Sequence, residues 1–325
     1  MIIIVSHEKD KHASVILEKL KEKGEDAVLL DYAEYPTFWQ GNVLFQEKQM
    51  NVTLTIDGQR IPGKSVKSIF YRRPRAAGMN LKYKNQAFTK YIREESEAFL
   101  ASLPHLIKAF WVSDPEAIER ASFKPLQLCV AKSMGFKIPA SSIGNSPKDV
   151  SMFLESLNET SIVTKSLESS YVEIDPATLS HNFVVYTKQV QSNWVRKHIG
   201  QIKNCPIIVQ ECINKKFDVR VTVVGNQVFA VAIETKGKKD VVDWRYYSLQ
   251  RKYKPHSLPQ IIIKKCRELV RRLGLTFGCI DLGYTSKGEY IFFEINPAGQ
   301  WLASEIYAGE QISDAITDLL SRGKI

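Results

Sequence analysis

Residues 277–305 read FGCIDLGYTSKGEYIFFEINPAGQWLASE, and the rest of the chain is interpreted around this stretch. Apolar residues alternate on both sides of the central SKGE tetrapeptide, which predicts two strands joined by a tight turn. If Thr285 faces Tyr290, the same register places Asp281 directly opposite Glu294. Directly opposed residues of an antiparallel pair share a face, with their Cβ atoms about 5 Å apart.

Asn296 lies two residues beyond Glu294 and therefore points to the same face. The other face is predicted to be core, filled by Ile280, Leu282, Ile291, Phe293 and Ile295. Two facing carboxylates repel each other, and a hard divalent cation such as Mg²⁺, which takes oxygen ligands, removes that repulsion. A carboxylate that caps a turn or pairs with a lysine is the alternative for any one residue. Together, Asp281, Glu294 and Asn296 predict a magnesium site.

This end of the chain resembles a known family. Asp281, Glu294 and the Glu-x-Asn-Pro run resemble the magnesium-binding end of ATP-grasp carboxylate–amine ligases. The continuation NPAGQWL at 296–302 resembles a narrower group, the graspetide macrocyclases of the microviridin type, which crosslink ribosomally made peptides. The resemblance implies an α/β (α+β) ATP-grasp fold, in which two α/β subdomains grip ATP, behind an N-terminal pre-ATP-grasp α/β domain. We expect domains at 1–115, 116–210 and 211–325.

Composition bounds the class of protein. With 325 residues the chain is long enough for two or three compact units. The sequence contains no run of 18 apolar residues, so no membrane-spanning helix is predicted. The first residues lack the features of a signal peptide and are predicted to form a strand. Five scattered cysteines without C-x-x-C spacing favour buried thiols in a reducing cytoplasm over zinc or disulfides. The net charge of +10 indicates an anionic partner: nucleotide, acidic peptide or nucleic acid.

The first third of the chain is predicted to be an α/β unit without a dinucleotide fingerprint, because no glycine-rich turn follows the first strand. The strand at 66–71 ends in the sequence YRRPR, which delivers three arginines to one point. A solvated basic edge and an anion-binding site are both open interpretations, since the arginine fork suits phosphate or carboxylate. The run also resembles the pre-ATP-grasp domain of the macrocyclases, and we assign Arg72 and Arg73 to peptide binding. A helix over 85–103 is expected to bury Phe88.

Two lysines are candidates for phosphate binding. Ser113 and Glu116 predict a capping box that opens the second unit, and Lys124 then lies near a helix start. Lys165 ends the short strand SIVTK and would bring a positive charge to the mouth of a cleft. The sequence contains no P-loop, so phosphate must be held in another way. In the family that the chain resembles, these two lysines contact the nucleotide phosphates.

Further nucleotide contacts follow from the resemblance. The segment Gln210, Glu211, Cys212, Ile213 corresponds to the chain that runs between the subdomains and reads the adenine edge. Asp218 and Arg220 share one face of a strand, where a cross-strand ion pair is the plain alternative. The resemblance places Asp218 near the ribose, with Asn296 also at the nucleotide. It places Arg220 on the transferring phosphate, and Arg245, in a DWR motif, is the second catalytic candidate.

The segment 171–198 is expected to form a polar hairpin, with paired strands at Phe183–Val190 and Trp194–Arg196. Trp194 and Arg196 would offer an aromatic and basic surface that ATP chemistry does not require. We predict that this surface holds the leader of a precursor peptide. A lid over the nucleotide is the alternative.

The resemblance implies a cytoplasmic enzyme that uses ATP and Mg²⁺ to activate Glu or Asp side chains of a precursor peptide with a leader and an acidic core. The acyl phosphates would then form esters with Thr or Ser, or amides with Lys, and leave ADP and phosphate. The alternative is a ligase that adds a free amino acid to a peptide or small molecule. A basic nucleic-acid-binding protein is a remote alternative, because no helix-turn-helix or aromatic-basic repeat occurs. We also expect a homodimer.

Overall fold

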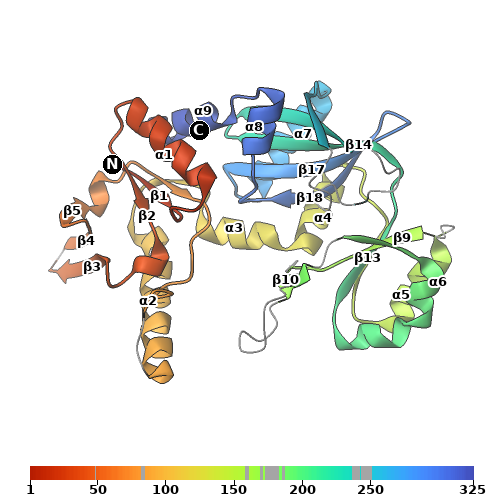
Figure 1. The fold of residues 1–325 in the computed structure, drawn as a ribbon, viewed down its shortest axis with the longest axis horizontal. Helices are drawn as coiled ribbons and strands as arrows, with labels where there is room; N and C mark the ends of the chain where they lie inside the picture. The colour runs from red at the N-terminus through yellow and green to blue at the C-terminus, as the bar shows by residue number, and fades with distance from the viewer. Residues whose placement is uncertain are drawn as a thin grey trace.

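The computed structural model describes residues 1–47, 49–81, 85–157, 161–168, 171–172, 183–184, 187–235, 242 and 251–325. Within these ranges the chain forms a mixed α/β fold with several separate sheets, so the predicted fold class is confirmed (Figure 1). No helix of this part of the chain is long and apolar enough to cross a bilayer.

The N-terminal region is built on a parallel sheet of order β2-β1-β6-β7. Its strands are β1 (Ile2–Val5), β2 (Ala27–Leu30), β6 (Ser68–Tyr71) and β7 (Phe110–Val112), with α1 (Lys11–Glu22) connecting the first two. All four residues of β1 are buried, as a continuous apolar strand of a parallel sheet requires. The predicted strand, helix, strand opening is therefore confirmed.

An antiparallel three-stranded sheet adjoins it, formed by β3 (Trp39–Gln46), β4 (Gln49–Ile56) and β5 (Gln59–Pro62). Asp57 and Gly58 both have positive φ angles, as a two-residue hairpin turn requires. The short 3₁₀ segments η1 (Tyr32–Glu34) and η2 (Gly63–Ser65) flank this sheet in sequence. This antiparallel sheet accounts for most of residues 39–62, between strands β2 and β6 of the parallel sheet.

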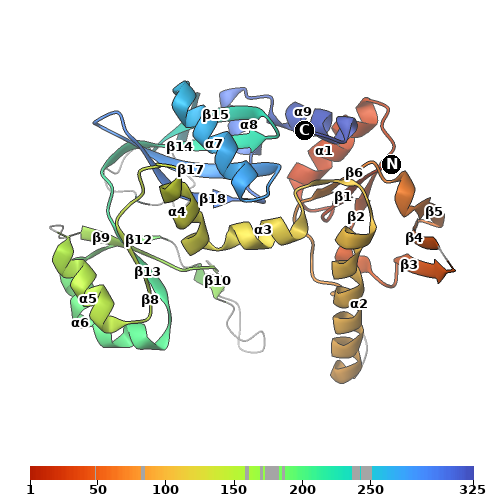
Figure 2. The same cartoon turned by 180° about the vertical axis from the view of Figure 1, so that it is seen from behind.

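A long helix, α2 (Gln86–Leu106), extends away from the body of the molecule in both views (Figures 1 and 2). The expectation that Phe88 is core is wrong, because its side chain is 62% exposed. The buried positions of α2 are Ser96, Leu100 and Leu103, in its second half. Only that part of the helix lies against a sheet, which explains the difference.

The second region begins with α3 (Pro115–Ser122) and α4 (Lys124–Ser133). The predicted capping box is wrong: Asp114 caps α3 by accepting from the backbone N–H groups of Glu116 and Ala117. The Ser113 hydroxyl instead accepts from the N–H groups of Thr276 and Phe277, at 2.9 and 3.1 Å. Ser113 therefore ties this entry point to the distant strand β17 (Phe277–Thr285).

A small antiparallel sheet of order β12-β9-β13-β8 follows. Its strands are β8 (Ser141–Gly144), β9 (Ser161–Lys165), β12 (Lys188–Gln191) and β13 (Ile207–Glu211). One face is covered by α5 (Pro147–Ser156), α6 (Ser192–Lys197) and η3 (Ile199–Asn204), which share a core with Ile162 and Val209. The backbone of β10 (Tyr171–Val172) pairs with that of β11 (Phe183–Val184).

The C-terminal sheet has the order β16-β15-β14-β17-β18 and is antiparallel throughout. Its other strands are β14 (Lys215–Val224), β15 (Gln227–Thr235), β16 (Arg251–Pro255) and β18 (Tyr290–Asn296). Helix α7 (Gln260–Arg272) shares a core with it, together with α3 and α4. The final helices are α8 (Leu302–Ala308) and α9 (Ile312–Arg322).

One hydrophobic core joins the two ends of the chain. Strands β1 and β6 contribute to the same cluster as β17 and α9, and its buried members include Ile2, Ile4, Phe70, Phe277, Trp301, Ile312, Ile316 and Leu320. Figure 1 accordingly shows α9 beside α1. Ser68 also donates a hydrogen bond to the carbonyl of Leu320, at 2.7 Å. The N-terminal region and the C-terminal sheet are therefore held together by shared packing.

All five cysteines are free, which agrees with the prediction that they form no disulfides. The expectation that they are all buried is wrong. Cys266 and Cys279 are buried, and burial raises the pKa of Cys266 to about 12. Cys129 and Cys205 are exposed, and Cys212 is half-buried.

Candidate active site

The predicted register of the β17–β18 pair is confirmed at the candidate metal ligands. Asp281 lies opposite Glu294, and Cys279 lies opposite Asn296. Nearer the turn it differs by one residue, because Tyr290 pairs with Tyr284 and not with Thr285. The register shifts between Asp281 and Leu282, as a β-bulge on β18 produces. The two carboxylates are thus adjacent on neighbouring strands.

The bulge corrects one predicted core position. Phe292, which pairs with Leu282, is fully buried, whereas Phe293 is only half-buried. The Phe293 ring lies 5.8 Å from the Lys165 Nζ atom and 5.5 Å from that of Lys215. A strict alternation cannot foresee an extra residue in one strand, so Phe293 was assigned to the wrong face.

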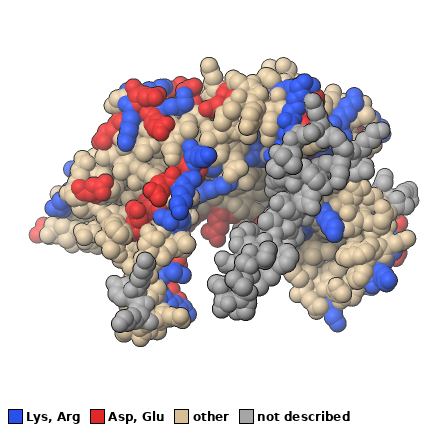
Figure 3. Space-filling model, in the orientation of Figure 1, with Lys and Arg blue, Asp and Glu red and all other residues tan. Residues whose placement is uncertain are grey.

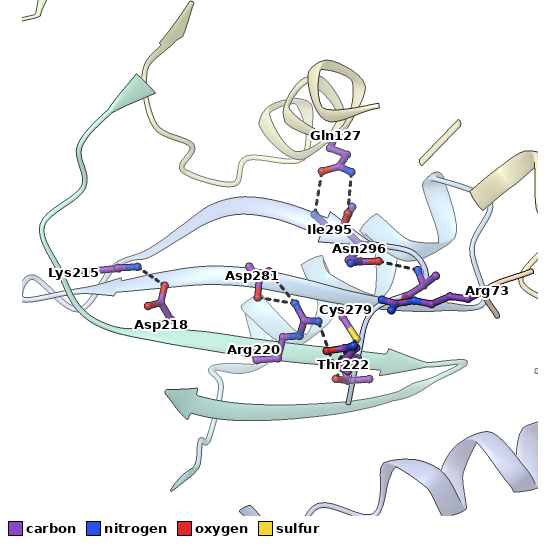
Figure 4. Close-up of polar contacts among 12 residues, drawn as sticks. Arg73, Gln127, Lys215, Asp218, Arg220, Thr222, Cys279, Asp281, Ile295 and Asn296 are labelled. Atoms are coloured by element: carbon purple, nitrogen blue, oxygen red, sulfur yellow. Dashed lines mark hydrogen bonds and ion pairs between the residues drawn. The ribbon is translucent and has the colours of Figure 1, made fainter. Parts of the chain in front are cut away.

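A guanidinium compensates the opposed carboxylates. Nη1 of Arg220, on the neighbouring strand β14, donates to both Asp281 oxygens at 2.8 Å, and Nη2 donates to the carbonyl of Gln300 at 3.2 Å (Figure 4). Burial of Arg220, which is 7% exposed, is the largest single influence and lowers its pKa, but several opposing interactions, led by the charge of the Asp281 carboxylate, together raise the pKa of Arg220. The cross-strand ion pair considered for Arg220 therefore exists, with Asp281 as its partner.

The donor set still fits a hard cation. An ionised carboxylate has about four acceptor positions, so Asp281 can accept from Arg220 and keep others. Glu294 adds a second carboxylate, and the Asn296 amide oxygen accepts from the N–H of Ala298 at 3.0 Å. No group of three or more His, Cys, Asp and Glu side chains that could hold a metal occurs in the described residues. An oxygen-only set of two carboxylates and one amide matches Mg²⁺.

Asp218 is paired with a lysine that the sequence analysis missed. The Lys215 ammonium lies 2.5 Å from the Asp218 carboxylate and 3.0 Å from the carbonyl of Val242. Residues three apart in a regular strand point to opposite faces, but the β14 register shifts between Lys215 and Phe217, which places both side chains together. The lysine could have been noticed only as one more basic residue near Asp218.

The predicted phosphate lysines approach the same region from two elements. Lys165 ends β9 and lies over the Phe293 ring. Lys124 begins α4 and donates to the carbonyl of Ser166 at 2.8 Å. The structure therefore brings Lys124, Lys165 and Lys215 together around β9 and the bulge of β18.

The predicted adenine segment links the small sheet of order β12-β9-β13-β8 to the C-terminal sheet. Gln210 is buried on β13 and donates to the Ser141 hydroxyl at 2.8 Å. Glu211 ends β13 and accepts from the N–H of Ala140 at 3.2 Å. Cys212 and Ile213 are half-buried and lead directly into β14.

Gln127 is a further residue that sequence reasoning missed. From helix α4 its amide donates to the carbonyls of Ala121 and Ile295, and its oxygen accepts from the N–H of Ile295 (Figure 4). Strand β18 is the edge of its sheet. Gln127 therefore pairs with the backbone N–H and C=O of Ile295 at this edge of the sheet. These bonds hold in place the strand segment that carries the candidate ligands Glu294 and Asn296. A glutamine three positions after Lys124, beside apolar residues of the predicted helix, was the available signal in the sequence.

Arg72 and Arg73 contact the loop after β18. Both donate to the carbonyl of Ala298, and Arg72 also reaches that of Gly299 at 3.0 Å. Arg72 is 2% exposed and lies 4.8 Å from the Trp301 ring centroid. Arg72 therefore faces the protein interior in this structure, and its assignment to peptide binding stays a prediction. Arg73 is half-buried beside it.

The predicted strand at Trp194–Arg196 is wrong, because these residues lie in helix α6, and β12 pairs with β9 instead. Val195 enters the core beneath α5, and this anchor favours a helical turn over a free hairpin. Trp194 remains 55% exposed, and Arg196 lies 3.8 Å from Glu155. Residues 173–182 and 185–186 of the predicted hairpin and the catalytic candidate Arg245 lie outside the described residues.

Comparison with known proteins now identifies the class. Residues 1–119 match the MvdD pre-ATP-grasp domain, and residues 120–320 match the RimK-like ATP-grasp domain. The chain belongs to the RimK-like ATP-grasp family and is an ATP-grasp ligase. ATP is the nucleotide that this family implies.

Three solved structures are similar over nearly the whole chain. The macrocyclase MdnC of Microcystis aeruginosa MRC, bound with precursor peptide MdnA, is 28% identical over 99% of both chains, with a TM-score of 0.85. A RiPP-associated ATP-grasp ligase of Chryseobacterium gregarium, in complex with ADP and a leader and core peptide, is 27% identical over 99% of this chain and 96% of that one, with a TM-score of 0.83. The M. aeruginosa macrocyclase MdnB is 26% identical over 98% of both, with a TM-score of 0.77. No curated protein matches the chain.

Proposed function

We propose that this chain is an ATP-dependent macrocyclase that crosslinks a ribosomally made precursor peptide. The observation that carries the proposal is the match to MdnC over 99% of both chains, which includes the N-terminal region as well as the ATP-grasp region. A similarity confined to the ATP-grasp region would leave any carboxylate–amine ligase equally supported. The proposal includes the expected domain boundaries: a pre-ATP-grasp domain at 1–115 and two ATP-grasp subdomains at 116–210 and 211–325.

Asp281, Glu294 and Asn296 would hold Mg²⁺, which neutralises phosphate charge when bound. Lys124 and Lys165 would contact the nucleotide phosphates, with Lys215 close by. The backbone from Gln210 to Ile213 would lie along the adenine, and Asp218 near the ribose. Phosphoryl transfer needs positioning and charge compensation more than covalent work by the protein.

In the first step, a carboxylate oxygen of the peptide attacks the γ-phosphorus of ATP and the bond to the ADP oxygen breaks. In the second, a Thr or Ser hydroxyl or a Lys amine attacks the acyl carbon, loses its proton and displaces phosphate. Arg220, and Arg245 as the second candidate, would stabilise the charge on the transferring group. Arg220 is preorganised for this by its bond to Asp281, since a fixed guanidinium needs no reorientation during the reaction.

The peptide partner would carry a leader and an acidic core, consistent with the net charge of +10. Arg73, Trp194 and Arg196 stay predicted peptide contacts, and Arg72 would act through the loop that it holds. The homodimer also stays a prediction. The alternative, transfer of a free amino acid, predicts ADP formation that depends on an amino acid and not on a precursor.

The test is ADP formation with candidate precursors encoded beside the gene, followed by mass spectrometry. Each crosslink removes one water, a loss of about 18 Da, whereas addition of an amino acid raises the mass. Precursor-dependent ADP release with loss of water supports the proposal. ADP release with free amino acids and an unchanged precursor would refute it.

A further inference from the structure

The candidate metal ligand Asn296 begins a tight turn. Residues 296–299 read Asn-Pro-Ala-Gly, and the N–H of Gly299 donates to the Asn296 carbonyl at 3.2 Å. Asparagine, proline and glycine in the first, second and fourth positions are typical of such a turn. The side-chain oxygen of Asn296 also accepts from the N–H of Ala298 at 3.0 Å. The orientation of the Asn296 amide is therefore tied to the backbone of this turn.

Two arginines of the N-terminal region hold the turn. Arg72 and Arg73 follow strand β6, and both donate to the carbonyl of Ala298, Arg73 with Nε at 3.2 Å and Nη2 at 3.1 Å. Nη1 of Arg72 also donates to the carbonyl of Gly299 at 3.0 Å. Figure 4 shows the side chains of Arg73 and Asn296 at this turn. Ala298 thus accepts from the arginines and donates to Asn296, so it links the two.

The turn lies so close to strand β17 that position 299 requires glycine. A Cβ atom added to Gly299 would lie 2.3 Å from the Cβ atom of Cys279 and 3.0 Å from Nη2 of Arg220. The first distance is far below an ordinary contact between carbon atoms. The position of the turn therefore depends on contact with β17 as well as on the bonds from Arg72 and Arg73.

Arg72 is an unfavourable residue for stability alone. It is 2% exposed, its Nε atom lies 3.4 Å from the Asp10 carboxylate, and neither Nε nor Nη2 makes a hydrogen bond within the described residues. Burial of an ion pair costs desolvation, and an apolar side chain of similar size often stabilises a protein equally well or better. The hydrophobic cluster that contains Trp301 already joins the two regions. These facts favour a role for Arg72 in placing the turn.

We propose that Arg72 and Arg73 are positioning residues of the metal site, because they fix the turn and thereby the Asn296 amide. An amide oxygen that accepts one N–H keeps a second acceptor position, with which it can bind a cation. A turn that moves lets the amide rotate and present its NH₂ group, which repels a cation. Groups that orient a metal ligand change metal affinity about 10–100-fold when they are removed. The inference rests on the proposed function for the metal site alone and not for the peptide substrate.

Binding of Mn²⁺ tests the proposal without turnover. Mn²⁺ takes the same oxygen ligands as Mg²⁺, and the EPR signal of free Mn²⁺, at a fixed concentration of ADP, reports how much the protein binds. We expect Arg73→Ala to raise the Mn²⁺ dissociation constant about tenfold, because the turn loses two bonds. Arg73→Lys keeps one donor for the same carbonyl and should recover most of the affinity. Arg75→Ala is the matched control, since Arg75 pairs with Asp31 and should not affect metal binding.

ADP formation gives a second readout. In Arg73→Ala the Mg²⁺ concentration for half-maximal ADP formation should rise about tenfold, while the rate at saturating Mg²⁺ stays near that of wild type. Arg72→Met, which keeps an apolar chain in the buried position, should shift the Mn²⁺ and Mg²⁺ dependence in the same direction.

An unchanged Mn²⁺ affinity in Arg73→Ala overturns the proposal, as does an equal loss in Arg75→Ala or wild-type protein that binds no Mn²⁺. If precursor binding weakens in Arg73→Ala while Mn²⁺ affinity does not, the arginine contacts the peptide and the proposal is overturned equally. A failed crosslinking assay beside a weakened Mn²⁺ affinity in Arg73→Ala would refute the proposed function and still support this inference.

Discussion

At the scale of single residues, the candidate site depends on charges that are already compensated within the protein. Asp281 accepts two bonds from Arg220, and Asp218 is paired with Lys215. Both pairs are nearly buried, where removal of one partner takes away the ion-pair partner of a charge that solvent hardly reaches. Substitutions here therefore affect stability and catalysis together, and experiments need to separate the two.

Glu294→Ala should lower ADP formation about a hundredfold or more, because it removes a charged metal ligand while the fold is retained. Asp281→Ala should lose activity similarly, but it also removes the carboxylate that pairs with buried Arg220 and should cost about 3 kcal/mol of stability. Steady-state ADP release at saturating Mg²⁺ and urea denaturation measure the two effects. Glu22→Ala, on the exposed side of α1, is the control. Substantial ADP formation by Glu294→Ala would show that the β17–β18 pair does not form the metal site.

Lys165→Ala should weaken ATP binding about tenfold, or about 1.4 kcal/mol, because it removes a counter-charge for the phosphates. Precursor affinity should change little. Calorimetric titration with ATP and with peptide distinguishes the two effects. Lys264→Ala, an exposed change on α7, should behave as wild type. Unaltered ATP affinity of Lys165→Ala would exclude this lysine.

At the scale of elements, two strand irregularities build the site. The bulge on β18 turns Phe293 toward the lysines, and the one on β14 brings Lys215 to the face of Asp218. Bulges re-aim side chains in this way near active sites. The edge of β18 is in turn held by Gln127 from α4. The irregular strand β18 therefore has a stabilising partner on another element.

Helix α6 carries the predicted leader-binding surface. Trp194→Ala combined with Arg196→Ala should weaken leader-peptide binding severalfold, because it removes the exposed indole and a positive charge. ATP affinity should stay the same, since α6 lies on the helix-covered face of its sheet. Fluorescence anisotropy with labelled leader and calorimetry with ATP measure both. Met152→Ala, an exposed apolar change on α5, is the control. A double variant that binds leader normally and loses ATP would contradict the assignment.

At the scale of the whole molecule, the N-terminal region and the C-terminal sheet meet around Trp301. Its indole donates to Ser313 at 2.9 Å, and His12 packs against its ring at 4.4 Å between centroids. Basic and acidic side chains are interspersed on the face of the molecule that Figure 3 shows. The joint at Trp301 therefore fixes how the two regions face each other.

His12 should make this joint sensitive to acid. Burial, and then the Arg72 guanidinium, lower the pKa of His12 from 6.5 to about 4. Between these values the unfolded chain binds a proton that the folded chain does not, so stability falls as the pH drops from about 6.5 toward 4. We expect wild type to lose about 1–2 kcal/mol more than His12→Asn between pH 7 and 5, measured by urea denaturation. Equal losses would show that His12 does not titrate in this way.

The sequence by itself determined the fold class, the ATP-grasp family, the core strands and the opposition of Asp281 and Glu294. The strands and the opposition of the two carboxylates follow from local alternation, which acts over a few residues, whereas the fold class and the family follow from the resemblance of the motifs to those of ATP-grasp ligases. Tertiary structure decided the rest: Lys215 and Gln127 at the site, the burial of Arg72 and the helical state of Trp194–Arg196. The reason is physical. A bulge, a contact between residues 168 positions apart, or a helix anchored by one valine depends on packing between distant segments, which no local pattern contains.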